Sequence, residues 1–127
     1  MAQGVLLDTQ AFLSAYLGDP LPKRAIAAML KNDRYLSAAS LWEVAIKSAQ
    51  GKLPPISEQQ VAEAARDLVV TILSITPQHV YRVFSLPVHH RDPFDRIIIA
   101  TALTEQLPLI GGDRIFKKYG GLQLIWK

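Results

Sequence analysis

Short apolar runs of strand length alternate with longer segments of helical periodicity along the chain, and Gly or Pro separates many of them. The strand-like runs cover residues 4–7, 35–37, part of 69–75, 108–110 and 122–126. Strands joined through helices pair in parallel, because a crossover helix returns the chain to the same end of the sheet. The sequence therefore predicts an α/β fold with a mainly parallel sheet of about five strands.

The length of 127 residues and the hydrophobic share of 50% suit one domain, residues 1–127, with a core of its own. No apolar run is long enough to cross a membrane, and residues 1–4 lack the basic start of a signal peptide. The absence of cysteine excludes disulfide scaffolds and thiolate zinc sites. We therefore expect a cytoplasmic protein that does not bind membranes.

Four carboxylates stand where strands and helices meet. Asp8 directly follows the strand at 4–7, and Asp113 follows the strand at 108–110 after two glycines. Glu43 and Asp95 lie near the starts of two predicted helices. Because the turns from strand to helix lie at one edge of a parallel sheet, we expect these four side chains to share one site.

Each of these acids also has a purely structural interpretation. Asp8 can cap the helix that follows it. Ser40 and Glu43 fit a capping box for a helix expected over 41–50, with Lys47 as the ion-pair partner one turn on. Asp92 precedes Pro93 and is the predicted N-cap of the next helix, which makes Asp95 the third helical residue.

A shared site favours a metal ion, because carboxylates brought together repel one another unless a cation balances them. Oxygen donors without cysteine favour Mg²⁺ or Mn²⁺, which can polarise a phosphoryl oxygen and activate a bound water. The chain has no Gly-x-Ser-x-Gly elbow and no Gly-x-x-x-x-Gly-Lys loop. Residues 8–10 (DTQ) also lack the second Asp of an Asp-x-Asp-x-Thr phosphatase loop.

The charge distribution points to a polyanionic substrate. The net charge is +3, but the four carboxylates and Asp92 together account for five of the eleven acids. The rest of the chain then carries six acids against fourteen Lys and Arg. A basic surface around an acidic site suits a nucleic acid that must meet metal ions.

Several segments together resemble a known family: residues 6–9 (LLDT), 40–47 (SLWEVAIK), 51–53 (GKL), 86–87 (LP) and 90–96 (HRDPFDR). They are similar to PIN-domain ribonucleases, specifically the VapC-like toxins of type II toxin–antitoxin systems. The resemblance implies a three-layer α/β/α sandwich and a Mg²⁺- or Mn²⁺-dependent endoribonuclease. It also implies a small cognate VapB-like antitoxin and a homodimer. The acidic quartet of the family, which is catalytic and binds the metal, falls on Asp8, Glu43, Asp95 and Asp113.

Further residues are candidates for supporting the carboxylates or contacting the substrate: Thr9, Lys47, His90, Asp92 and Arg96. The adjacent histidines at 89–90 are not expected to bind the metal. One position departs from the family pattern, because Gly111 stands where Thr or Ser is common, two residues before the last Asp. The missing hydroxyl predicts a lower metal affinity or a lower rate.

Two other functions remain open from the sequence. A catalytically weak or silent PIN-fold module could bind RNA or protein, and Gly111 is the feature that favours it. A metal-dependent phosphatase acting on small phosphoesters is the second alternative, disfavoured by the basic surface and the missing second Asp.

Overall fold

The computed structural model describes residues 4–127. In this part of the chain five strands form one sheet in the order β3-β2-β1-β4-β5, and every neighbouring pair is parallel. The strands are β1 (Gly4–Leu7), β2 (Asp33–Ser37), β3 (Val70–Leu73), β4 (Leu109–Ile110) and β5 (Leu124–Ile125). The predicted α/β fold with a parallel, five-stranded sheet is confirmed.

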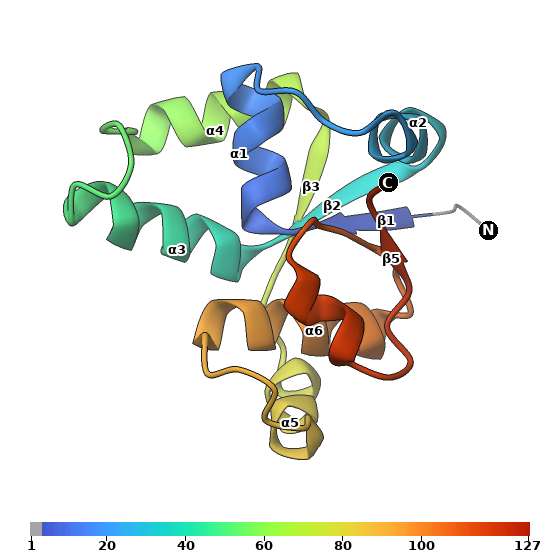
Figure 1. Cartoon of the computed structure of the whole chain (residues 1–127). Helices are drawn as coiled ribbons and strands as arrows, with labels where there is room; N and C mark the ends of the chain where they lie inside the picture. Colours follow the sequence, from blue (N-terminus) through green and yellow to red (C-terminus); the bar gives the residue numbers. More distant parts are fainter. Residues whose placement is uncertain (1–3) are drawn as a thin grey trace.

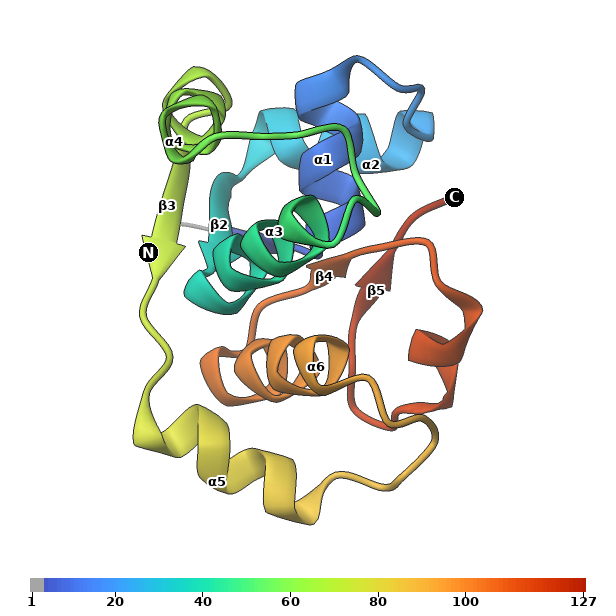
Figure 2. The ribbon, with the colours of Figure 1, turned by 90° about the vertical axis from the view of Figure 1, so that its left-hand side faces the viewer.

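Helices cover both faces of the sheet (Figures 1 and 2). One face carries α1 (Thr9–Leu17), α2 (Lys23–Lys31), α3 (Ala38–Ala49) and α4 (Glu58–Asp67). The other face carries α5 (Pro77–Ser85), α6 (Pro93–Glu105) and the short 3-10 helix η1 (Arg114–Lys118). The result is the expected three-layer sandwich. Within residues 4–127, no helix combines the length and apolar character that a membrane crossing requires.

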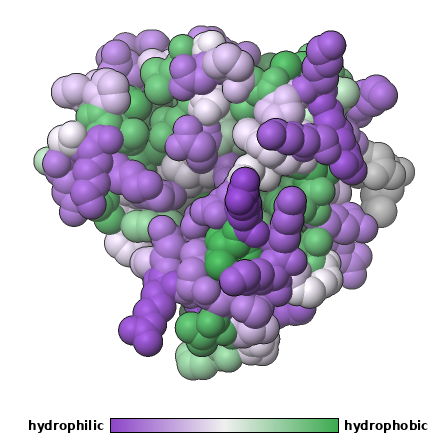
Figure 3. Space-filling view, viewed as in Figure 1, coloured by the Kyte–Doolittle hydropathy of each residue, from purple (hydrophilic) through white to green (hydrophobic). Residues whose placement is uncertain are grey.

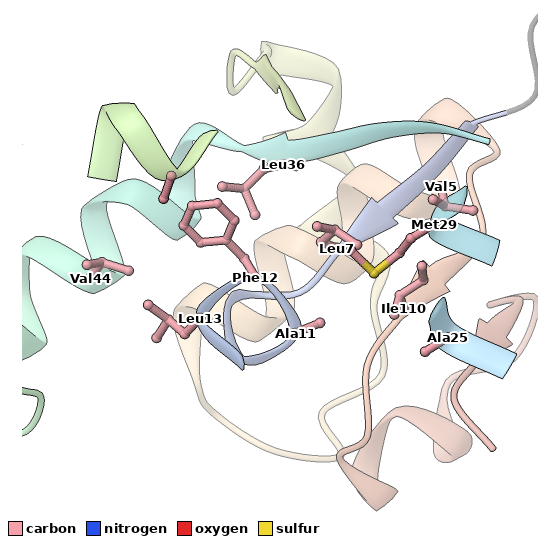
Figure 4. Packing of buried hydrophobic residues seen from close by; sticks show 11 residues of the cluster. Val5, Leu7, Ala11, Phe12, Leu13, Ala25, Met29, Leu36, Val44 and Ile110 are labelled. Atoms are coloured by element: carbon pink, nitrogen blue, oxygen red, sulfur yellow. The ribbon is translucent and has the colours of Figure 1, made fainter. Parts of the chain in front are cut away.

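The central strand β1 supplies side chains to both cores. Val5 and Leu7 point to the side of α1 and α2, whereas Leu6 points to α6, and all three are almost fully buried. Figure 4 shows Leu7 among Phe12, Met29 and other residues of the first core. Burying each such side chain contributes about 1.5–3 kcal/mol, which explains why β1 is a continuous apolar run.

The start of α3 corrects one prediction. The helix begins at Ala38, and its N-cap is Ser37, whose hydroxyl accepts from the Ala39 amide. The predicted capping box of Ser40 and Glu43 is therefore wrong. The helix follows directly from β2, so Ser40 lies inside the first turn and accepts a hydrogen bond from the Thr9 hydroxyl at 2.9 Å. Glu43 lies in the second turn, where it satisfies no helix-start amide.

The strand order creates a crevice at the carboxyl ends of β1 and β4. β1 pairs with β2 on one side and with β4 on the other, so the connections diverge at this point. Open α/β sheets bind their ligands at such a switch point. Asp8 follows β1, and Asp113 lies three residues after β4, so both lie at this crevice.

Candidate functional site

A hollow of about 490 Å³ opens at this edge of the sheet. All four predicted carboxylates line it, together with the predicted supporting residues Thr9, Lys47 and Asp92. His90 and Arg96 are not among the lining residues. The complete lining is Asp8, Thr9, Gln10, Leu13, Glu43, Lys47, Leu53, Asp92, Asp95, Gly112, Asp113, Phe116 and Trp126. Four segments of the sequence thus bring their acids to one place.

Asp8 is both a helix cap and a wall of the hollow. Its Oδ1 accepts from the Ala11 amide at 2.7 Å, and the side chain is only 5% exposed. Burial raises the pKa of Asp8 from 3.8 to about 7 against the lowering effect of that hydrogen bond, and the negative charges of Asp95, Glu43 and Asp113 raise it further. The structural interpretation of Asp8 as a helix cap is therefore confirmed, and the same carboxylate also lines the hollow.

Gly111 makes room for this carboxylate. A Cβ at position 111 would lie 2.6 Å from Asp8 Oδ2 and 2.9 Å from Phe116 Cε2, both too close. A Thr or Ser at this position would require the Asp8 carboxylate and the Phe116 ring to shift. The departure from the family pattern is thus coupled to the position of Asp8 in this chain.

Glu43 is buried on the inner side of α3, with an exposed fraction of 3%. Its Oε2 pairs with Lys47 Nζ at 2.9 Å, and the hydrogen bond to Glu43 is the main cause that raises the pKa of Lys47. Oε1 has no partner, and among residues 4–127 it is the one buried side-chain polar atom in this condition. A buried carboxylate oxygen without a donor is costly, so this atom points to a cation that completes the site.

Asp92 and Asp95 differ as the sequence predicted. Asp92 Oδ1 accepts from the Asp95 amide at 2.9 Å and caps α6. The Asp95 side chain lies in the hollow, where burial, followed by the charges of Asp92 and Glu43, raises its pKa to about 6. His90 opposes this rise through a contact of 3.3 Å between its Nε2 and Asp95 Oδ2.

Tyr119 connects His90 to Arg96 and was not predicted as a site residue. Its hydroxyl lies 2.7 Å from His90 Nδ1 and accepts from Arg96 Nη1 at 3.4 Å. Arg96 also donates to the Pro87 carbonyl oxygen at 2.8 Å. Both predicted residues therefore lie outside the lining of the hollow, and of the two His90 contacts Asp95 directly. No sequence signal identifies Tyr119, because its partners are 23 and 29 positions away.

Asp113 is the exposed member of the quartet. Its Oδ1 accepts from the Ile115 amide at 3.1 Å and caps η1. Asp113 therefore lies at the rim of the hollow, whereas Asp8 and Glu43 form its floor.

The donor set suits a hard divalent cation. It consists of carboxylate oxygens, of which Glu43 Oε1 has no partner. The pKa values of Asp8 and Asp95 are raised above that of an isolated Asp. In the part of the chain that is described, no three His, Asp or Glu side chains are yet close enough to hold an ion.

The comparisons agree with this architecture. Residues 5–122 match the PIN domain family model. The fold is similar to a chain of the VapBC2 complex from Rickettsia felis bound to a promoter DNA fragment, with 16% identity and a TM-score of 0.72 over 96% of this chain and 97% of that one. A chain of DNA-bound VapBC from Salmonella typhimurium gives 17% identity and a TM-score of 0.71 over 98% and 97%. A chain of FitAcB from Neisseria gonorrhoeae gives 19% identity and a TM-score of 0.62 over 94% of this chain and 95% of that one.

No curated protein sequence matches the chain closely enough to count as a relative. The family model, however, matches nearly the whole chain, from the first strand to the segment before the last. The resemblance read from the sequence and the family-model match lead to the same family. This chain belongs to the PIN-domain family.

Proposed function

We propose that this protein is a metal-dependent endoribonuclease that hydrolyses RNA phosphodiester bonds and acts as a VapC-like toxin. The observation that carries the proposal is the unpartnered, buried Oε1 of Glu43 in a hollow that it shares with Asp8, Asp95 and Asp113. Four acids in one hollow are hard to explain as helix caps alone, since Glu43 and Asp95 cap nothing.

In this proposal Asp8, Glu43, Asp95 and Asp113 hold Mg²⁺ or Mn²⁺. A bound ion would supply charge stabilisation at the phosphate and a more acidic water. The other residues prepare the ligands. Lys47 pairs with Oε2 of Glu43, which leaves Oε1 for the ion. Thr9 holds Ser40, and so joins the starts of α1 and α3 on which Asp8 and Glu43 are placed.

The direct test is cleavage of RNA with and without divalent metal. We expect cleavage of an RNA substrate in Mg²⁺ or Mn²⁺ and loss of cleavage in excess EDTA. Gel electrophoresis of the RNA measures both. Cleavage that persists at full rate in EDTA would contradict the metal mechanism.

The same assay separates the alternatives. A small phosphoester hydrolysed in place of RNA would support the phosphatase, and RNA binding without any cleavage would support the silent module. The coupling of Gly111 to Asp8 weakens the case for the silent module, because the glycine accommodates the acidic quartet rather than disrupting it.

A protein partner is part of the proposal. The structural neighbours include complexes described as VapBC and as a toxin–antitoxin complex. We infer a small VapB-like antitoxin that inserts Arg or Lys into the acidic hollow, and a homodimer of this chain in the cytoplasm, where RNA is available. Exposed apolar side chains on and after α5 support such protein contacts, with Tyr81, Phe84 and Val88 exposed by 68%, 85% and 71%.

Expression of this chain without a partner is expected to arrest growth, because nothing then covers the hollow. Asp8→Asn should abolish the arrest while keeping the cap, since Asn Oδ1 can also accept from the Ala11 amide. Growth curves and immunoblots at matched expression check this. Equal growth of cells with wild-type protein and with the variant would remove the support for a toxin.

A further inference from the structure

A second hollow, of about 440 Å³, adjoins the acidic one. The two share Gly112, Asp113 and Trp126 in their linings, so they form neighbouring parts of one surface. Unlike the acidic hollow, this one is lined by four basic residues: Arg24, Arg114, Lys117 and Lys127. We call it the basic hollow.

The cations of the basic hollow come from segments far apart in the sequence. Arg114 and Lys117 are exposed on η1, and Arg24 is exposed on α2, from where its Nη1 donates to the Lys127 carbonyl oxygen at 3.1 Å. Figure 3 shows hydrophilic side chains gathered over η1 and the neighbouring C-terminal segment. Within residues 4–127 none of the four cations forms an ion pair. Their charge therefore remains available to an anion from outside.

Trp126 lies at the boundary between the two hollows. A Cβ on Gly112 would lie 2.5 Å from its Cε2 and 2.7 Å from its Nε1, so the glycine is what lets the indole lie against the backbone here. The ring is partly buried and lines both hollows. An aromatic ring beside a row of cations is the usual arrangement for single-stranded nucleic acid, in which phosphates meet the cations and a base stacks on the ring.

We propose that the basic hollow binds the backbone of single-stranded RNA and that a base next to the scissile phosphate packs against Trp126. This inference rests on the proposed function, because it places the substrate relative to the acidic hollow. Two or three phosphates interact with Arg24, Arg114 and Lys117, and the strand then passes Trp126 to reach the carboxylates. Asp113, at the border of both hollows, ends the cationic track.

The first test measures binding without catalysis, by fluorescence anisotropy of a labelled single-stranded RNA in EDTA. The variant Arg114→Gln/Lys117→Gln is compared with Lys31→Gln/Arg82→Gln, which removes the same charge from exposed positions outside both hollows. We expect roughly tenfold weaker binding for the first variant at moderate salt. The slope of log affinity against log salt should fall by about 1.4 for the two lost phosphate contacts. Equal losses in both variants would overturn the proposal.

The second test follows Trp126 itself. Trp42 is 61% exposed and packs edge-on against Phe94, so Trp42→Phe leaves Trp126 as the single tryptophan and keeps an aromatic ring there. Single-stranded RNA should quench the fluorescence of Trp126, whereas an abasic strand of the same length should bind without comparable quenching. Equal quenching by both strands, or none by RNA, would exclude base packing on this residue.

The two proposals fail in different ways. If the wild-type protein cleaves RNA but the Arg114→Gln/Lys117→Gln variant binds it normally, the basic hollow is not the backbone site and the ribonuclease proposal stands. If RNA binds through the basic hollow but is never cleaved in any divalent metal, the binding site stands and the catalytic proposal fails.

Discussion

Asp95→Asn is expected to remove nearly all RNA cleavage while leaving the protein as stable as the wild type or slightly more stable. The loss should exceed about a hundredfold, because losing even the groups that support a metal ligand costs 10–100-fold. Burial and the charges of Asp92 and Glu43 raise the pKa of Asp95 to about 6, so its negative charge is unfavourable at neutral pH. Asn has nearly the same shape without that charge.

Asp92→Ala is the matched comparison, because it removes a carboxylate three residues away that does a different job. Its Oδ1 accepts from the Asp95 amide, and losing an N-cap costs about 1 kcal/mol of unfolding free energy. Cleavage should fall less than in Asp95→Asn, since the loss acts only through the start of α6 and through the hollow that Asp92 lines.

Thermal melts and single-turnover cleavage on both variants decide the assignment. An active Asp95→Asn beside an inactive but stable Asp92→Ala would reverse the two roles. A large loss of stability in Asp95→Asn would instead show that its carboxylate holds the fold through His90.

The fold was predictable because its information is local and repeated. The apolar run 4–7 and the cap-then-proline start of α6 are patterns in a few consecutive residues, and the structure has them where expected. The start of α3 was predicted wrongly, because Ser37 and Ser40 are both good caps. The choice between them depends on where β2 ends, and that is decided by pairing with β1 and β3.

The candidate site also has one part that local sequence patterns predict and another part that depends on the tertiary structure. The positions of Asp8 and Asp113 follow from strand ends, and the parallel topology then brings them to one edge. The chain from Asp95 through His90 and Tyr119 to Arg96 depends on side chains that only the tertiary structure brings together. The same is true of Gly111, whose fit against Asp8 is a contact between two neighbouring strand ends.

Asp8→Asn should remove a contribution to the pH dependence of stability that runs opposite to ordinary acid denaturation. The pKa of Asp8 is about 7 in the folded protein and 3.8 as the ordinary value. Between these values the folded state binds more protons than the unfolded state, so this group lowers the free energy of unfolding as pH rises. Below pH 3.8 Asp8 is protonated in both the folded and the unfolded state. Above about pH 7 it is ionised in both states, and the whole cost of burying its charge lowers the free energy of unfolding.

In metal-free buffer, Asp8→Asn should therefore melt several degrees above the wild type at pH 8. A pKa unit corresponds to about 1.4 kcal/mol, and each kcal/mol shifts the melting temperature of a domain of this size by roughly 3–5 °C. The advantage should shrink toward pH 4–5, where the wild-type carboxyl is neutral. Asp19→Asn, at an exposed acid away from the hollow, controls for the loss of one charge. A difference in melting temperature that stays constant from pH 4 to pH 8 would show that ionisation of buried Asp8 does not cause the difference in stability.

Adding Mg²⁺ or Mn²⁺ extends the same experiment to the metal. A cation that binds only the folded protein stabilises it. Once the cation concentration exceeds the dissociation constant, the free energy of unfolding rises with the logarithm of that concentration. It also pairs with the ionised form of Asp8, so the wild type at pH 8 should regain the stability that it lacks in metal-free buffer. Asp8→Asn should gain little, because a ligand oxygen with full negative charge is missing. A metal-induced rise in melting temperature that is equal in both proteins would place the ion away from Asp8.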